Sequence, residues 1–187
     1  MRIPDIDEAS PTPEQERVFA AIKAGPRGVV VGPLRVWLHS PKLAEKAQEL
    51  GAFCRYGTSL PSVLSELAIL VTGAYWRAGF EWHAHAPIAI KAGLPTGVVE
   101  AIRDGREPRF VDPAQAAVYA FCRRLLTTRT MDQTTYDHAR HAIGEKGVVD
   151  LVGILGYYAL ISMTIVGFDV PVPDGAAEPF ALARNDP

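Results

Sequence analysis

Cysteine is scarce in this sequence, with only Cys54 and Cys122 among 187 residues. Small disulfide-stabilised proteins use cysteine far more densely, so we expect two reduced, half-buried thiols. The two cysteines are far apart in sequence, and a dithiol redox centre needs a closely spaced pair. The sequence therefore gives no basis for disulfide redox chemistry.

An excess of positive charge and several catalytic signatures are also missing. The net charge of −2 leaves no electrostatic footprint for nucleic acid. There is no GxSxG nucleophile motif and no glycine-rich phosphate loop after a strand. The first ten residues, MRIPDIDEAS, hold no apolar segment of the signal-peptide type. We therefore expect a cytoplasmic protein that does not bind nucleic acid.

Long apolar runs are limited to one, residues 151–168, which read LVGILGYYALISMTIVGF. This run is just long enough to cross a membrane. It contains three glycines, however, and Asp150 and Asp169 flank it where lysine or arginine would be typical. We expect no membrane span but a helix buried in the centre of the protein or in a subunit interface, because an apolar helix is normally covered on all sides.

Proline, glycine and capping residues divide the chain into helices. Thr12-Pro13, Ser40-Pro41 and Asp112-Pro113 each place a capping residue before a proline, which is typical of a helix start. We predict an N-terminal extension (residues 1–39) with one short helix and an extended loop over residues 28–38. A helical domain (residues 40–168) and a proline-rich irregular tail (residues 169–187) follow. The predicted fold class is all-α, a bundle of about seven helices. The helices expected in the domain cover about 41–56, 62–76, 80–92, 96–104, 114–128, 133–144 and 148–167.

Chemistry-capable side chains are densest in residues 66–93, which read ELAILVTGAYWRAGFEWHAHAPIAIKAG. Glu81 and His85 are four apart, so they share a helix face, and Trp82 lies three before His85. His83 points elsewhere. Its spacing from His85 is wrong for two ligands on one helix, so we expect no metal site.

Glu66, on the preceding helix, has two interpretations that helical spacing leaves open. It can pair with His85 as an acid–base couple, or it can satisfy backbone donors near the helix start while His85 is a core histidine. An unpaired buried carboxylate would be costly.

The same stretch resembles the core motif of the carboxymuconolactone decarboxylase family, which shares its fold with alkyl hydroperoxidase D-like (AhpD-like) proteins. The motif is a Glu in an apolar helix, a Tyr/Phe-Glu-Trp-x-x-His run and then Ala-x-x-x-Gly-Leu. Here these are Glu66, residues 80–85 and residues 89–94. The long apolar helix also resembles the family's last helix, so most of residues 40–168 falls within the resemblance.

The resemblance implies a helical bundle that assembles as a homotrimer or homohexamer and acts on a small-molecule substrate without a cofactor. The peroxidase branch carries a Cys-x-x-Cys pair ahead of the His, and the matching positions here are Ala78 and Glu81. Both thiols are absent, which favours the decarboxylase branch. The expected function is a carboxy-lyase acting on a small carboxylated lactone or a related acid of aromatic catabolism. The alternatives are a hydroperoxidase-like oxidoreductase and a non-catalytic oligomer that binds a small ligand.

The resemblance also suggests roles for individual residues. His85 is the expected proton donor and Glu66 orients it, while Trp82 and Glu81 line the substrate site. A carboxylate of the substrate needs a cationic or hydrogen-bonding partner, for which the sequence does not choose among four candidates. These candidates are Arg55, Tyr56, Arg77 and His39.

Overall fold

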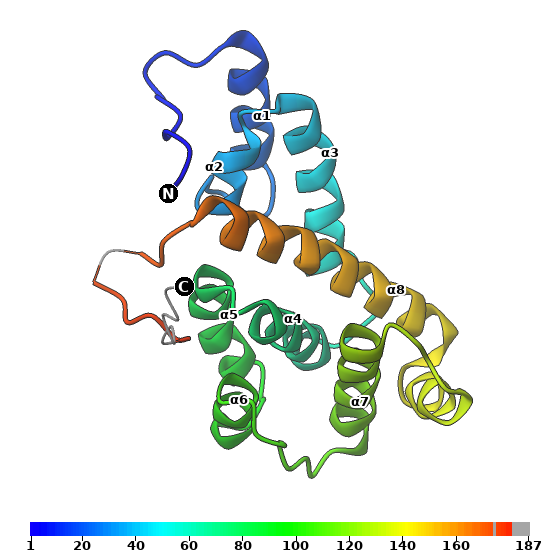
Figure 1. Ribbon diagram of the computed structural model, residues 1–187. Coiled ribbons are helices and arrows are strands. Elements are labelled where there is room, and N and C mark those ends of the chain that lie inside the picture. Colours follow the sequence, from blue (N-terminus) through cyan, green and yellow to red (C-terminus); the bar gives the residue numbers. More distant parts are fainter. Residues whose placement is uncertain (174, 181–187) are drawn as a thin grey trace.

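Two helices, α4 and α8, form the centre of the protein (Figure 1). The structure is a computed structural model and describes residues 1–173 and 175–180. This part of the chain contains helices and no strands. The elements are α1 (Pro13–Ala24), α2 (Pro33–Trp37), α3 (Pro41–Ala52), the π-helical turn η1 (Phe53–Gly57), α4 (Ser62–Trp76), α5 (Gly79–Lys91), α6 (Thr96–Arg103), α7 (Pro113–Thr128) and α8 (Gln133–Phe168). The predicted all-α class is confirmed.

The arrangement of the helices follows from which faces are apolar. Every residue of α4 from Leu64 to Gly73 is buried, as expected for a helix that is apolar on all sides. Helices α5, α7 and α8 pack around it, while α1, α2 and α3 cover the opposite side of α8 (Figure 1). Residues 1–39 thus contribute to the core instead of lying apart from it.

Most of the predicted helix starts are correct. Thr12 accepts from the Gln15 amide while the Gln15 side chain accepts from the Thr12 amide, which completes a capping box. Asp112 and Asp132 also cap their helices: the side chain of Asp112 accepts from the Ala114 amide of α7, and that of Asp132 accepts from the Thr135 amide of α8. Ser40 makes no such side-chain bond, although a proline still opens α3.

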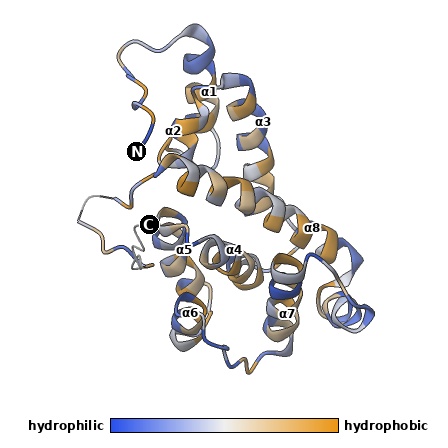
Figure 2. Cartoon of the chain, in the orientation of Figure 1, coloured by the Kyte–Doolittle hydropathy of each residue, from blue (hydrophilic) through white to orange (hydrophobic). Residues whose placement is uncertain are grey.

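The α8 element consists of two helical segments joined at Gly144. This glycine has φ of 72°, a value that side chains disfavour, and the helical path breaks there. The sequence predicted two separate helices here, one before and one after this point. Figure 2 shows the first segment as largely hydrophilic and the second as largely hydrophobic.

Two details differ from the sequence predictions. Residues 33–37 form the short helix α2 instead of an extended loop, because Gly32 turns the chain with positive φ and Pro33 begins the helix. Helical spacing also predicts that the helix over residues 41–56 buries Leu43, Ala47, Leu50 and Cys54 on one face, which is wrong for two of the four. Leu43 and Leu50 are exposed, and the buried side of α3 consists of small residues that let it approach α8 closely.

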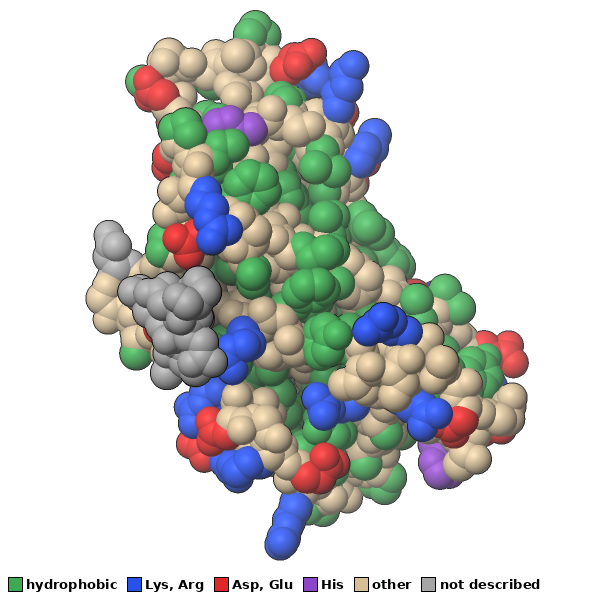
Figure 3. All heavy atoms as spheres, viewed as in Figure 1, with side chains coloured by type: hydrophobic (Ala, Val, Ile, Leu, Met, Phe, Trp, Pro, Cys, Tyr) green, Lys and Arg blue, Asp and Glu red, His purple; other side chains and the backbone are tan. Residues whose placement is uncertain are grey.

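The second segment of α8 has one exposed apolar side. Residues such as Leu151 and Ile154 are buried, whereas five large apolar side chains face outward. These are Val149, Val152, Met163, Val166 and Phe168. Figure 3 shows hydrophobic side chains gathered across the middle of the viewed face, over α8 and its neighbour α3. The helix is long and apolar enough to cross a membrane, but half of its most apolar window is buried inside the fold, as in the core helix of a bundle.

Candidate active site

A two-residue connection between α4 and α5 positions the candidate site. Arg77 adopts the left-handed conformation (φ 53°) and ends α4, and the Ala78 amide donates back to the Gly73 carbonyl at 2.9 Å. Helix α5 begins at the next residue, so the two helices run back alongside each other. Gly73 faces the side chain of Glu81 on the neighbouring helix, at a distance where a Cβ would make ordinary van der Waals contact with it.

Within this helix pair, His85 lies between two carboxylates. Its Nδ1 is 2.7 Å from Oε2 of Glu66, and its Nε2 is 2.9 Å from Oε1 of Glu81. The exposed fractions are only 4%, 5% and 4% for Glu66, Glu81 and His85. The structure therefore brings Glu66 and His85 into the contact that sequence spacing left open. It also adds Glu81 as a second carboxylate on the same ring.

This geometry favours the imidazolium form of His85. Burial alone lowers the pKa of the ring, but the charges and hydrogen bonds of Glu81 and Glu66 outweigh it and raise the pKa of His85 to about 9. Only the doubly protonated ring can donate from both nitrogens, one to each carboxylate. At neutral pH the site therefore stores a proton on His85.

Two tyrosines of α8 complete the surroundings of His85. The ring of Tyr158 meets the imidazole edge to face, with ring centroids 5.3 Å apart. Tyr157 packs on Tyr158 in the same manner at 5.2 Å. Burial raises the pKa of Tyr158 well above its usual value, and the charge of Glu81 adds to this effect. Both tyrosines therefore remain protonated at neutral pH and can act as hydrogen-bond donors.

Trp82 and His83 lie on other sides of α5. Trp82 is buried against Phe180 of the tail, with ring centroids 5.3 Å apart. The aromatic ring that packs on His85 is that of Tyr158. His83 is exposed, as its position on the helix predicts.

The four candidate carboxylate binders are spread over the protein. Arg55 in η1 stacks on the exposed ring of Tyr56 at 5.1 Å, and it is near enough to Tyr157 and Tyr158 to influence their pKa values. His39 is exposed and its Nε2 lies 2.9 Å from the carbonyl of Pro4. Of these residues, Arg55 is the one placed beside the aromatic pair.

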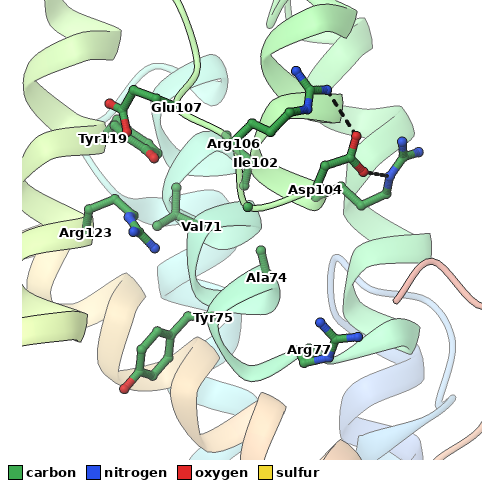
Figure 4. A pocket seen from close by; sticks show the side chains of 12 residues that line it. Val71, Ala74, Tyr75, Arg77, Ile102, Asp104, Arg106, Glu107, Tyr119 and Arg123 are labelled. Atoms are coloured by element: carbon green, nitrogen blue, oxygen red, sulfur yellow. Dashed lines mark hydrogen bonds and ion pairs between the residues drawn. The ribbon is translucent and has the colours of Figure 1, made fainter. Parts of the chain in front are cut away.

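Arg77 lines a pocket that does not include His85. A pocket of about 180 Å³ lies between α4, α6 and α7, and Figure 4 shows Arg77 at the end of α4 and Arg123 on α7 among its lining residues. Asp104 in this pocket pairs with Arg103 and Arg106 (Figure 4). None of Glu66, Glu81 and His85 belongs to its lining.

The side chains of this chain do not favour thiol or metal chemistry at His85. Cys54 and Cys122 are buried and free, and burial raises the pKa of Cys54 to about 11 and that of Cys122 further. Both are thus held as thiols, which are poor nucleophiles. Across residues 1–173 and 175–180, no group of three or more His, Cys, Asp or Glu is arranged to hold a metal ion. Both ring nitrogens of His85 are already engaged by carboxylates.

Sequence reasoning missed Tyr158 and Arg27. Tyr158 had a weak signal, because Tyr157 and Tyr158 form a polar-tipped pair in an otherwise aliphatic run. Arg27 follows α1 in a short loop and had no signal. Its Nη2 donates to the Tyr157 hydroxyl at 3.0 Å, a contact 130 residues apart in sequence.

Comparisons with known proteins identify the fold of this chain. No protein-family model matches the sequence, and no curated protein matches it. Among solved structures, a cysteine-to-alanine variant of the debrominase Bmp8 in complex with 2,3,4-tribromopyrrole has a TM-score of 0.73 at 16% identity, covering 96% of this chain and 94% of that one. A peroxidase-related protein from Silicibacter sp. TM1040 has a TM-score of 0.72 at 12% identity, covering 91% and 90%.

A third similar structure is a protein of unknown function from Agrobacterium tumefaciens, a candidate antioxidant-defence protein of the AhpD type. Its TM-score is 0.65 at 13% identity, and the match covers 76% of this chain and 99% of that one. At such low identity these likenesses concern the fold alone. The chain has the AhpD-like helical fold.

Proposed function

We propose that this protein is a cofactor-independent carboxy-lyase that decarboxylates a small carboxylated lactone or a related acid of aromatic catabolism. The observation that supports this proposal is the buried Glu66–His85–Glu81 cluster, with its proton stored between two carboxylates. The resemblance of residues 66–94 to the decarboxylase motif supplies the reaction class.

Loss of carbon dioxide from such a substrate breaks a carbon–carbon bond and leaves an electron pair. The conjugated lactone accepts this pair as a dienolate, so no cofactor is needed as an electron sink. A new C–H bond then forms at the carbon alpha to the lactone carbonyl. We assign this proton to His85. Glu66 holds Nδ1 of the ring, so Nε2 is the nitrogen that gives its proton to the substrate. The substrate carbon takes the place that Glu81 occupies in this structure.

A raised pKa suits a general acid, because the group must already be protonated when the substrate binds. His85 with a pKa of about 9 is protonated throughout the neutral range. The cation also stabilises negative charge on the nearby dienolate before transfer. After transfer, the neutral imidazole regains its proton from solvent, because its two carboxylates again favour the charged form.

The thiols of this chain do not favour a peroxidase. The fold is shared with a peroxidase-related protein, but that likeness carries no activity at 12% identity. Disulfide-based peroxide reduction needs an accessible thiolate. The buried Cys54 and Cys122, with raised pKa values, do not supply one. A purely structural ligand-binding role would not require a buried carboxylate on each side of His85, which is costly unless fully paired.

The test is release of carbon dioxide from 4-carboxymuconolactone by the purified protein. We expect turnover by the wild type and a loss of about 10²–10⁴-fold in His85→Gln, the usual contribution of a general acid. His83→Gln is the matched control, because His83 is exposed on the same helix two residues away. A wild type without turnover would refute the lyase assignment. A His85→Gln rate close to that of His83→Gln would refute the role of His85.

A further inference from the structure

Two buried donors close to the His85 cluster have no hydrogen-bond partner. They are the hydroxyl of Tyr158 and the Nε–H of Arg27. An unsatisfied buried polar group destabilises the folded state, and native proteins contain few of them. Such a group next to a candidate active site is well placed to bind a ligand.

The two donors belong to one connected set of side chains. Arg27 donates through Nη2 to the hydroxyl of Tyr157, and Tyr157 packs edge to face on Tyr158. Tyr158 in turn packs on the ring of His85. Gly51 makes the arrangement possible, because a Cβ at this position would overlap the Tyr157 hydroxyl and the Arg27 guanidinium. The N-terminal extension thereby reaches the surroundings of His85 through Arg27.

Charge in this region is positive and incompletely compensated. Glu66, protonated His85 and Glu81 together carry one net negative charge. Arg27 and Arg55 add two positive charges, and neither takes part in an ion pair in the described part of the chain. Both act on Tyr158, since their charges lower its pKa against the larger effect of burial. One additional anion would balance the region.

We propose that Arg27 and Tyr158 form an anion subsite that binds one carboxylate of a small organic acid beside His85. The guanidinium of Arg27 would donate Nε–H, and Tyr158 would donate its hydroxyl, to the same carboxylate group. Arginine suits this task because its planar fork matches a carboxylate. The subsite deepens the proposed lyase function and rests on it for the identity of the bound acid. Neither residue was among the carboxylate binders that the sequence suggested.

Benzoate and its neutral analogue benzamide provide the test, because they share a shape and differ in charge. NMR of the intact protein follows the arginine Nε–H signals during titration with each compound. We expect saturable benzoate binding that shifts the Arg27 Nε–H signal, and much weaker binding of benzamide. Arg27→Gln and Tyr158→Phe should each weaken benzoate binding about tenfold or more, the loss of one hydrogen bond to a charged group. Tyr158→Phe keeps the ring that packs on His85.

Arg106→Gln is the control, because Arg106 is exposed and pairs with Asp104 in the other pocket. It should bind benzoate as the wild type does. Absence of saturable binding by the wild type, an unshifted Arg27 signal, or unchanged affinity in both Arg27→Gln and Tyr158→Phe would each overturn the subsite. Benzoate binding needs no turnover. A subsite without carbon dioxide release would therefore count against the lyase alone, and His85-dependent release without the subsite would count against the subsite alone.

Discussion

Raising the pH from about 6.5 to about 9 should destabilise the fold through His85. The pKa of this ring is about 9 in the folded protein, against 6.5 for a fully solvated histidine such as that of the unfolded chain. Between these values the folded state binds one more proton than the unfolded state, so stability falls as the pH rises. The contribution is fully present below pH 6.5 and is lost as the pH passes about 9.

The size of this effect follows from the linkage relation. Each pH unit in the interval costs about 1.4 kcal/mol of unfolding free energy, so the whole interval is worth about 3 kcal/mol. That is a large part of the 5–15 kcal/mol typical of a native domain. No discount for solvent screening is needed, since His85 and both carboxylates are buried.

The double variant Glu66→Gln, Glu81→Gln is the matched comparison. It removes both carboxylates and keeps the size of the side chains, so burial is left as the main influence and lowers the pKa of His85 below 6.5. The sign of the His85 contribution then reverses, and stability falls on acidification instead. The assay is urea unfolding at a series of pH values, with the difference between the two proteins cancelling the exposed histidines. Parallel curves between pH 6.5 and 9 would refute the protonated state of His85.

Two further predictions concern packing and assembly. Gly51→Ala should lower the unfolding free energy by about 1–3 kcal/mol, because the new methyl group overlaps Tyr157 and Arg27, whereas Gly97→Ala in the open helix α6 should be neutral or slightly stabilising. Equal unfolding midpoints for these two variants would contradict the close packing at Gly51. The exposed apolar side of α8 should be covered by other copies, so light scattering should give the mass of a homotrimer or homohexamer, and Met163→Glu should shift it toward the monomer. A monomeric wild type would contradict this assembly.

Local signals in the sequence were sufficient for most of the helices. The helix over residues 62–76 was predicted with the bounds that the structure shows, because Leu60-Pro61 indicates a helix start at Ser62. The break at Gly144 was visible as a change from polar to apolar composition. Residues 33–37 were predicted wrongly because Gly32-Pro33 indicates a turn and a helix start equally well.

Contacts between helices were beyond the reach of local patterns. Glu81 and His85 were correctly placed on one face, since they are four positions apart on one helix. The hydrogen bond between His85 and Glu66 depends on how α4 and α5 align along their lengths. Helical periodicity does not define this alignment. Helical spacing placed Leu43 and Leu50 on the apolar face of their helix, yet α3 buries its small residues against α8. The position of Arg27 depends on the path of the whole N-terminal segment.

Decarboxylation in heavy water tests most directly whether His85 delivers the proton. The product gains one hydrogen at the carbon alpha to the lactone carbonyl, and a fixed donor adds it to one face only. We predict that the wild type incorporates deuterium there with a single stereochemistry. We also predict that His85→Gln releases carbon dioxide slowly and incorporates deuterium on both faces. Random incorporation by the wild type, or the same single stereochemistry in His85→Gln, would contradict the assignment of His85 as the proton donor.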